Sequence, residues 1–136
     1  MIKVAIVGAT GIVGQQAIIS LINHPWFKIT KLAASERSAG KAYEESLRDA
    51  GGASRWWCPE ELPTEIGTMV VENAAQFDPN EVDLIFSTIE AGVAKELEPK
   101  WSKTTPVIST ASAFRYEDDT PILVGGVNME RPKPYL

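Results

Sequence analysis

The first fourteen residues constrain the fold more than any other part of this chain. An apolar run, Val4 to Val7, leads into a turn with glycine at positions 8, 11 and 14, and a segment with helical apolar spacing follows. Glycine lets a backbone turn tightly and approach a pyrophosphate, whose charge the amide-rich end of a helix stabilises. A glycine turn alone is a weak signal, but between a strand and a helix it predicts a dinucleotide-binding unit.

Strands and helices alternate along the rest of the chain. Helical spacing covers residues 11–22 and ends before Asn23-His24-Pro25, because proline disfavours a helical conformation in the preceding residue. A second helix is predicted over 92–103, where Val93, Leu97 and Trp101 recur every four residues. The expected strands are 3–7, 29–34, 68–72, 82–88, 106–109 and 122–124. This alternation predicts an α/β fold, a doubly wound parallel sheet of the Rossmann-like kind.

One segment, residues 35–63, has no clean period and contains several glycines and prolines. We expect a long connection with a short helix near 42–48. A connection of this length inside a compact domain is usually functional or poorly ordered.

Length and composition limit the functional classes. The 136 residues suit one domain, 1–136, and the net charge of −5 argues against a nucleic-acid partner. No apolar stretch approaches the roughly 20 residues that span a bilayer, and nothing resembles a signal peptide, so no membrane partner is expected. A single cysteine, Cys58, excludes an internal disulfide and fits a cytoplasmic location, and with one histidine it leaves no metal site to predict.

Polar and glycine-rich segments follow four of the predicted strands. In a parallel sheet the carboxyl ends of the strands share one edge, where ligands bind. This places four segments together, namely 8–14, 35–41, 87–92 and 109–115.

The segment 34–41, Ala-Ser-Glu-Arg-Ser-Ala-Gly-Lys, bears on the choice of nucleotide. Arg37 offers a planar fork of donors suited to a phosphate, and Lys41 adds a point charge. These groups suit a 2′-phosphate as the ligand, which favours NADP over NAD. Two alternatives stay open: Glu36 could hold a ribose hydroxyl, as acidic residues do in NAD-binding domains, or the loop is a solvated polar surface.

Five motifs occur in the order found in one enzyme family. They are Gly8 to Gly14, Ala34 to Lys41, Asp83 to Ser87, Val107 to Arg115 and Val127-Asn128. Together they resemble the N-terminal, NADP-binding part of aspartate-semialdehyde dehydrogenases, particularly the archaeal and fungal type. The resemblance implies reduction of aspartyl phosphate to the semialdehyde with NADPH, through a cysteine thioester, on the pathway to lysine, methionine and threonine. It also implies a homo-oligomeric full-length enzyme.

The resemblance assigns roles to particular residues. Thr10, Gly11, Ile12 and Val13 would lie along the pyrophosphate, between Gly8 and Gly14. Ser35, Arg37 and Ser38 would grip the 2′-phosphate, and Ser87 would lie near the nicotinamide ribose. Arg115 resembles the arginine that binds the phosphate of the acyl phosphate, and Asn128 an asparagine near the active site.

The chain departs from the family pattern in three respects. Thr110 stands where the family usually has asparagine, and Gly125-Gly126 stand where it usually has Pro-Glu. The nucleophilic cysteine and the general-base histidine of the family lie further along than Leu136. We therefore expect a fragment or a truncated product, without the catalytic and dimerisation domain, in which apolar residues after Val124 are uncovered.

Cys58 and His24 are poor substitutes for the family's catalytic pair. Acyl transfer needs an activated thiolate, whereas Glu60 and Glu61 beside Cys58 would raise the pKa of its thiol. His24 ends the first predicted helix, at the amino end of the strands. We expect a packing thiol and a helix-end imidazole, and no catalytic residue in the chain.

Other functional classes stay open. Short-chain reductases need Tyr-x-x-x-Lys, but Leu47 follows Tyr43 and Thr120 follows Tyr116 at that spacing, so this enzyme class is excluded. A nucleotide-binding or regulatory module without chemistry is compatible with the sequence. Related acyl-glutamyl-phosphate and malonyl-CoA reductases are also compatible, because their substrate choice lies mainly in a second domain.

Overall fold

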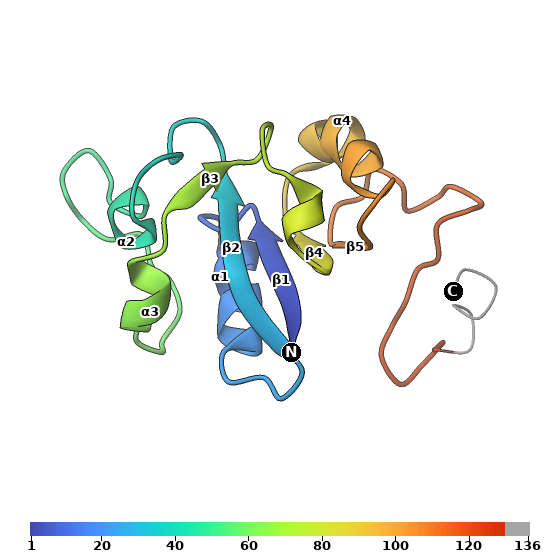
Figure 1. The fold of residues 1–136 in the computed structure, drawn as a ribbon, viewed down its shortest axis with the longest axis horizontal. Coiled ribbons are helices and arrows are strands. Elements are labelled where there is room, and N and C mark those ends of the chain that lie inside the picture. The colour runs from blue at the N-terminus through green and yellow to red at the C-terminus, as the bar shows by residue number, and fades with distance from the viewer. Residues whose placement is uncertain (130–136) are drawn as a thin grey trace.

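A computed structural model describes residues 1–129 of the chain. Its core is one sheet of five parallel strands in the order β3-β2-β1-β4-β5 (Figure 1). The strands are β1 (Ile2–Val7), β2 (Phe27–Ala34), β3 (Val71–Asn73), β4 (Leu84–Ser87) and β5 (Val107–Ser109). The helices are α1 (Ile12–Leu21), α2 (Tyr43–Ser46), α3 (Thr64–Gly67), the 3₁₀ helix η1 (Pro79–Glu81) and α4 (Ala91–Trp101). This is the predicted Rossmann-like fold, with the first strand at the centre.

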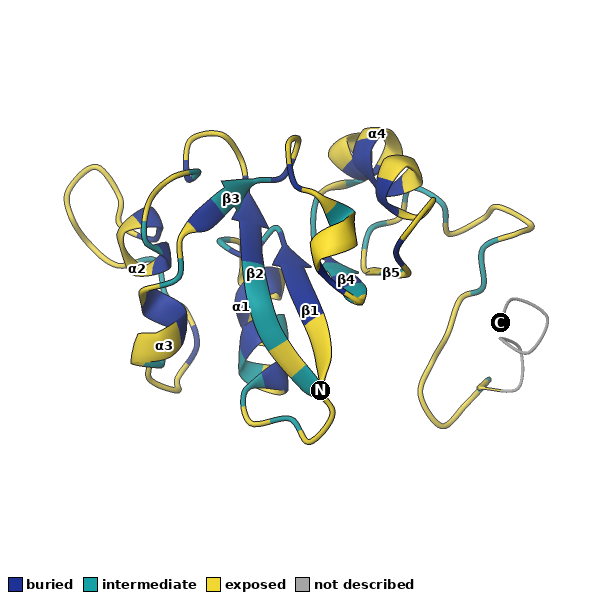
Figure 2. Ribbon diagram, in the orientation of Figure 1, coloured by how far each residue is buried: buried dark blue, intermediate teal, exposed yellow. Residues whose placement is uncertain are grey.

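Helices cover both faces of the sheet, as the continuous apolar run in β1 requires. Val4 and Ile6 pack in a cluster with residues of α1, α2 and α3, whereas Ala5 and Val7 pack in a second cluster with residues of α4. In Figure 1, α1 lies behind β1 and β2, and α4 lies at the β4–β5 end of the sheet. Figure 2 shows the upper part of β1 and β2 as the most buried region, so the carboxyl end of β1 is fixed by packing on both sides.

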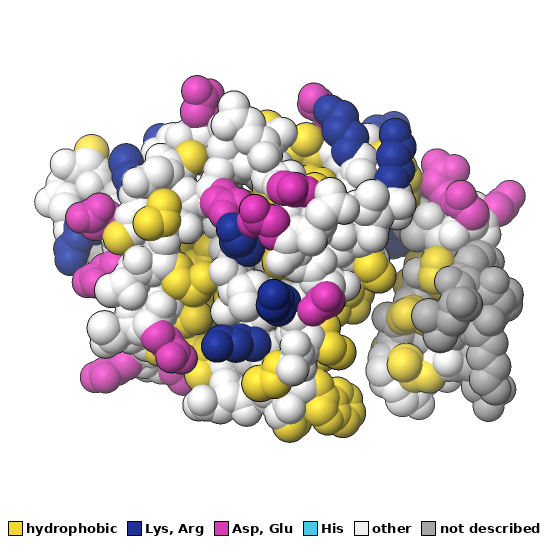
Figure 3. Space-filling model, in the orientation of Figure 1, with side chains coloured by type: hydrophobic (Ala, Val, Ile, Leu, Met, Phe, Trp, Pro, Cys, Tyr) yellow, Lys and Arg dark blue, Asp and Glu magenta, His cyan; other side chains and the backbone are white. Residues whose placement is uncertain are grey.

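The open part of the front face carries charges. Figure 3 shows basic and acidic side chains side by side over its centre. Lys31 of β2 pairs with Glu72, at 2.6 Å, and with Glu81. Hydrogen bonds and charge from these two carboxylates raise the pKa of Lys31, so its amine stays charged. This charged surface covers the middle of the sheet and reaches β3 through Glu72.

Most predicted elements are present with shifted ends. The strand expected over 29–34 begins earlier, at Phe27, and the strand expected over 68–72 is displaced to 71–73. Val70, just before it, forms only an isolated bridge with Ala42. The short helix expected near 42–48 is α2, while α3 and η1 were not predicted. In α4, Leu97 and Trp101 are buried as predicted, whereas Val93 is 37% exposed; Ala94 and Glu98 complete the buried face.

The predicted strand 122–124 is wrong. Its backbone groups bond locally instead of pairing with a neighbouring strand. Asn128 Oδ1 accepts from the Val124 N–H at 2.6 Å, and Asn128 Nδ2 donates to the Ile122 carbonyl at 2.7 Å. The apolar triplet 122–124 predicted a strand, but the Asn128 side chain bonds the backbone groups that would otherwise pair with a neighbouring strand. β5 is therefore the edge strand of the described sheet.

Among residues 1–129, none of the helices combines the length and the apolar character needed to cross a membrane.

Candidate functional site

The glycine turn lies at the carboxyl end of β1, between β2 and β4. Gly8 has a φ of +85°, a conformation that favours glycine, and its N–H donates to the Ala33 carbonyl at 2.9 Å. A Cβ at Gly8 would lie 2.7 Å from Thr88 Oγ1 and 2.9 Å from Thr88 backbone atoms. Thr88 in turn donates its hydroxyl to the Val7 carbonyl at 2.8 Å. Gly8 is therefore required both by its backbone angle and by the close approach of the residue after β4.

The other two glycines have different surroundings. A Cβ at Gly14, in the first turn of α1, would lie 2.3 Å from the Gly8 carbonyl oxygen, so the helix packs directly on the turn. A Cβ at Gly11 would meet only that same oxygen, at 3.5 Å. Gly8 and Gly14 thus hold the strand and helix together, while Gly11 faces open space.

The N-terminus of α1 is suited to an anion. Gly11 caps it without a side-chain hydrogen bond, and no acidic residue lies in the first turn. Ile12 and Val13 are 64% and 50% exposed, so the surface above the helix end is accessible. Uncapped amide groups and the helix dipole favour negative charge at such an end.

The loop after β2 forms one tight turn. The Ser38 N–H donates to the Ser35 carbonyl at 3.0 Å, and Gly40, with a φ of +81°, donates to the Val71 carbonyl at 2.8 Å. Ser35 and Arg37 are exposed, whereas Ser38 is only 3% exposed. Within residues 1–129, Arg37 forms no ion pair, so its guanidinium is available to a ligand.

A hollow of about 320 Å³ adjoins this loop. It lies at the carboxyl ends of β2 and β3 and is lined by Ala39, Gly40, Val71, Glu72, Asn73 and Gln76. The residues at the end of β3 are not among the predicted site residues, because the predicted strand, 68–72, ends one residue before Asn73.

Ser87, the last residue of β4, is completely buried. Its hydroxyl has no hydrogen-bond partner among the described residues, and its carbonyl accepts from the Thr110 N–H at 3.0 Å. That Ser87 lies beside a cofactor remains a prediction. Because Ser87 is buried, the accessible surface at this end of β4 is formed by the residues that follow it.

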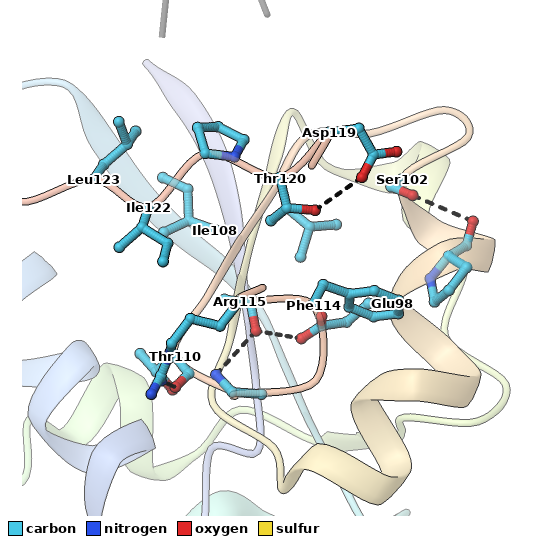
Figure 4. A pocket seen from close by; sticks show the side chains of 15 residues that line it. Glu98, Ser102, Ile108, Thr110, Phe114, Arg115, Asp119, Thr120, Ile122 and Leu123 are labelled. Atoms are coloured by element: carbon cyan, nitrogen blue, oxygen red, sulfur yellow. Dashed lines mark hydrogen bonds between the residues drawn. The ribbon is translucent and has the colours of Figure 1, made fainter. Parts of the chain in front are cut away.

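Arg115 lies in a second cavity, of about 700 Å³, between β5, α4 and the segment that follows β5 (Figure 4). Its guanidinium donates to the Thr110 carbonyl at 3.3 Å and is otherwise exposed. Ile108, Phe114 and Ile122 give the cavity an apolar part. Asn128 is not part of this cavity, because its amide is bonded within its own turn, to residues 122 and 124.

Two buried side chains support the glycine turn and were not recognised as site residues. Tyr43 donates its hydroxyl to the Ala9 carbonyl at 2.6 Å, and Gln15 donates to the Thr10 carbonyl at 3.2 Å. Gln15 is a polar residue of α1, yet it is fully buried. A signal was present, since Gln15 lies three residues before Ile18 on the buried stripe of α1.

Cys58 and His24 are placed as expected. Burial, and secondarily the charge of Glu60, raises the pKa of the Cys58 thiol, which also accepts from Gln16 Nε2 at 3.4 Å. His24 accepts from the Trp26 N–H at 3.2 Å and lies before β2, at the amino ends of the strands. The glycine turn is at the opposite end of β1. The structure brings neither residue to the candidate site.

Comparison with known proteins gives a consistent result. Residues 3–134 match the family model described as semialdehyde dehydrogenase, NAD binding domain. The chain is 41% identical over 130 residues to the aspartate-semialdehyde dehydrogenase of Methanothermobacter thermautotrophicus, covering 96% of this chain and 35% of that protein. It is 34% identical over 128 residues to a malonyl CoA reductase (NADP) of Metallosphaera sedula, covering 93% of this chain and 34% of that protein.

A solved structure agrees with the computed one. The crystal structure of aspartate semialdehyde dehydrogenase with NADP from Candida albicans superposes with a TM-score of 0.87 at 36% identity, covering 98% of this chain and 36% of that chain. The chain thus spans about a third of the length of the relatives that it matches.

Proposed function

The chain belongs to the semialdehyde dehydrogenase family, as its nucleotide-binding domain, and from this premise we propose that it binds NADP(H) for an aspartate-semialdehyde dehydrogenase. The reaction proposed for the complete enzyme is the reductive dephosphorylation of aspartyl phosphate to aspartate semialdehyde. Two relatives with that name are 41% and 40% identical to the chain over 130 and 131 residues, and a solved relative contains NADP.

One observation carries the proposal, namely the helix end of α1 exposed at the centre of the sheet. It offers uncapped backbone amides and no opposing carboxylate in the first turn. Thr10, Gly11, Ile12 and Val13 would hold the pyrophosphate there, because amides at a helix N-terminus bind phosphate well. Gly11 leaves the space that a close approach needs.

The preference for NADP rests on the loop after β2. Arg37 is exposed and forms no ion pair within residues 1–129, so it can offer its donor fork to a 2′-phosphate. Ser35, also exposed, would add a hydroxyl donor. The buried Ser38 would contribute through the turn that it closes with Ser35.

NADPH, when bound, would supply the hydride of the reaction. Arg115 would bind the phosphate of the acyl phosphate, because a guanidinium fork matches that group. The thiolate that forms the thioester is expected from the region of the relatives that this chain does not cover. Cys58 does not fit that role, because burial raises the pKa of its thiol.

Malonyl CoA reductase activity is a second candidate, supported by the relative from Metallosphaera sedula. Both candidates would use NADP(H), and they differ in the acyl group and in its leaving group, which is phosphate in one reaction and CoA in the other. Association of the complete enzyme into oligomers belongs to the same proposal.

Calorimetric titration of the 136-residue chain with NADP⁺ and with NAD⁺ tests the proposal. We expect saturable binding of both and tighter binding of NADP⁺. With NADP⁺, aspartate semialdehyde and phosphate we expect no NADPH, either from this chain or from Cys58→Ser. Absence of nucleotide binding would refute the proposal, and turnover that depends on Cys58 would refute the assignment of the thiolate.

A further inference from the structure

Two carbonyl groups of the glycine turn accept hydrogen bonds from buried side chains. They belong to Ala9 and Thr10, the residues between the first two glycines. The donors are Tyr43, in α2, and Gln15, in α1, and both are completely buried. Neither side chain is exposed to a ligand, so their effect must pass through the backbone of the turn.

Tyr43 is a rigid donor. Its hydroxyl lies 2.6 Å from the Ala9 oxygen, across 34 residues of sequence. The Tyr43 N–H donates to the Met69 carbonyl at 2.8 Å, and its ring packs edge-on against Trp56, with the ring centroids 6.4 Å apart. Backbone and ring are both held, so the position of the hydroxyl is well defined.

Gln15 uses its whole side-chain amide. Its Oε1 accepts from the Trp57 N–H at 2.7 Å, and its Nε2 donates to the Arg55 carbonyl at 2.8 Å and to the Thr10 carbonyl at 3.2 Å. Because the Trp57 N–H can only donate, this orientation of the amide is the one that satisfies all three partners. Gln15 therefore ties the glycine turn to the connection before Cys58.

The connection itself is anchored in turn. Arg55 donates from its backbone N–H to the Leu47 carbonyl at 2.8 Å, and from Nη2 to the Ser46 carbonyl at 3.2 Å. Residues 43–57, which we call the brace, thus form a bonded unit behind the glycine turn. The sequence of this region gave no period and no motif.

The geometry of the peptide bond gives the brace a consequence for ligands. In a trans peptide the N–H points opposite to the C=O. Tyr43 holds the Ala9 carbonyl toward the protein interior, so the Thr10 N–H points away from it. That N–H donates to no acceptor among residues 1–129. The Gly11 N–H, by contrast, is used inside the turn, on the Gly8 carbonyl at 3.1 Å.

We propose that Tyr43 and Gln15 are positioning residues that fix the peptide planes of the glycine turn, so that the Thr10 N–H is set to donate to the pyrophosphate of the nucleotide. This inference rests on the proposed nucleotide binding. Tyr43 sets the Ala9–Thr10 peptide, and Gln15 sets the Thr10–Gly11 peptide from which α1 starts.

Tyr43→Phe tests the proposal, because it removes one hydroxyl and keeps the ring. NMR titrations of the ¹⁵N-labelled chain compare NADP⁺ with adenosine 2′-phosphate, which lacks the pyrophosphate. We expect about a three- to tenfold loss of NADP⁺ affinity, the effect of one neutral hydrogen bond, and unchanged affinity for adenosine 2′-phosphate. Tyr116→Phe, at a tyrosine that is 90% exposed, is the matched control and should change neither.

The outcomes separate the two proposals. Equal losses for both ligands, or no loss for either, would overturn the positioning role while leaving nucleotide binding intact. If the wild-type chain binds neither ligand, the proposed function fails, and this inference fails with it.

Gln15→Met provides a second readout in the free chain, because methionine fills a similar space without the donor and acceptor of the amide. We expect a shifted Thr10 amide resonance, and faster alkylation of Cys58 because the Arg55 carbonyl and the Trp57 N–H lose their partner. In Tyr43→Phe we expect the shifted resonance without the faster alkylation. An unchanged Thr10 resonance in both variants would overturn the proposal.

Discussion

The two ends of this chain carry two kinds of candidate site, and they are built differently. At the glycine turn, hydrogen bonds join residues 34 and 40 positions apart, through the buried side chains of Tyr43 and Gln15. The side-chain bonds of Arg115 and Asn128 themselves reach only four to six residues along the chain and are exposed, although Ser109 donates to Glu98, eleven residues away, in the same cavity as Arg115. Figure 1 shows the same contrast, since the segment after β5 runs away from the sheet.

The difference in hydrogen bonding indicates which of the two candidate sites can form within this chain alone. Long-range bonds hold the nucleotide side in one arrangement before any ligand arrives. On the side that contains Arg115, the side chains of Arg115 and Asn128 bond only within their own turns, beside the edge strand β5. We therefore expect nucleotide binding to be a property of this chain, whereas the phosphate site depends on further contacts.

The largest effect on stability is expected from Gly14→Ala. Its Cβ would lie 2.3 Å from the Gly8 carbonyl oxygen, and neither backbone can move away easily. We expect a loss of about 3 kcal/mol in the free energy of unfolding, at the upper end of overpacking costs, together with loss of nucleotide binding. Urea denaturation measures it, and Gly125→Ala, which has open space around its Cβ, is the control. A neutral Gly14→Ala would mean that the close approach is not required.

Arg37→Ala should affect the nucleotide and not the fold. Loss of the guanidinium fork should cost about 1.5–3 kcal/mol of NADP⁺ affinity, and NAD⁺ affinity should hardly change. Calorimetric titration with both nucleotides measures the difference. Equal losses of NADP⁺ and NAD⁺ affinity would show that Arg37 does not bind the 2′-phosphate. They would favour the alternative in which Glu36 holds a ribose hydroxyl.

A smaller effect is expected from pH. Burial, and secondarily the charge of Cys58, raises the pKa of Tyr43 above its ordinary value of 10.0. Folding therefore favours the protonated hydroxyl, and this contribution is complete below pH 10 and is lost as the pH rises. We expect a decrease of roughly 1 kcal/mol in the free energy of unfolding one pH unit above the ordinary value. Tyr43→Phe should flatten this dependence in urea denaturation at pH 8 to 11, and an unchanged slope would contradict the burial argument.

The smallest effect is expected from Arg115→Lys in this chain. The guanidinium makes one exposed bond, to the Thr110 carbonyl at 3.3 Å. We expect changes of no more than about 0.5 kcal/mol in stability and in NADP⁺ affinity, as for other surface substitutions. In a complete enzyme the same change should weaken the use of phosphate, since lysine lacks the bidentate fork. A large loss of NADP⁺ affinity would place Arg115 at the nucleotide instead.

The sequence was most informative where the residues of a short motif determine the local backbone conformation. The glycine turn at the end of β1 and the parallel sheet were predictable, because glycine spacing and apolar runs reflect local physics. The brace was not, since Tyr43 reaches the Ala9 carbonyl only through tertiary packing. The strand expected over 122–124 failed for a related reason, because an asparagine outside the apolar triplet occupies its backbone groups.

Hydrogen–deuterium exchange with and without NADP⁺ tests the contrast between the two ends most directly. We expect the nucleotide to slow exchange at residues 10–14 and in the loop 35–41, and to leave exchange at 110–129 unchanged. Slower exchange centred on Arg115, with none at the glycine turn, would contradict it.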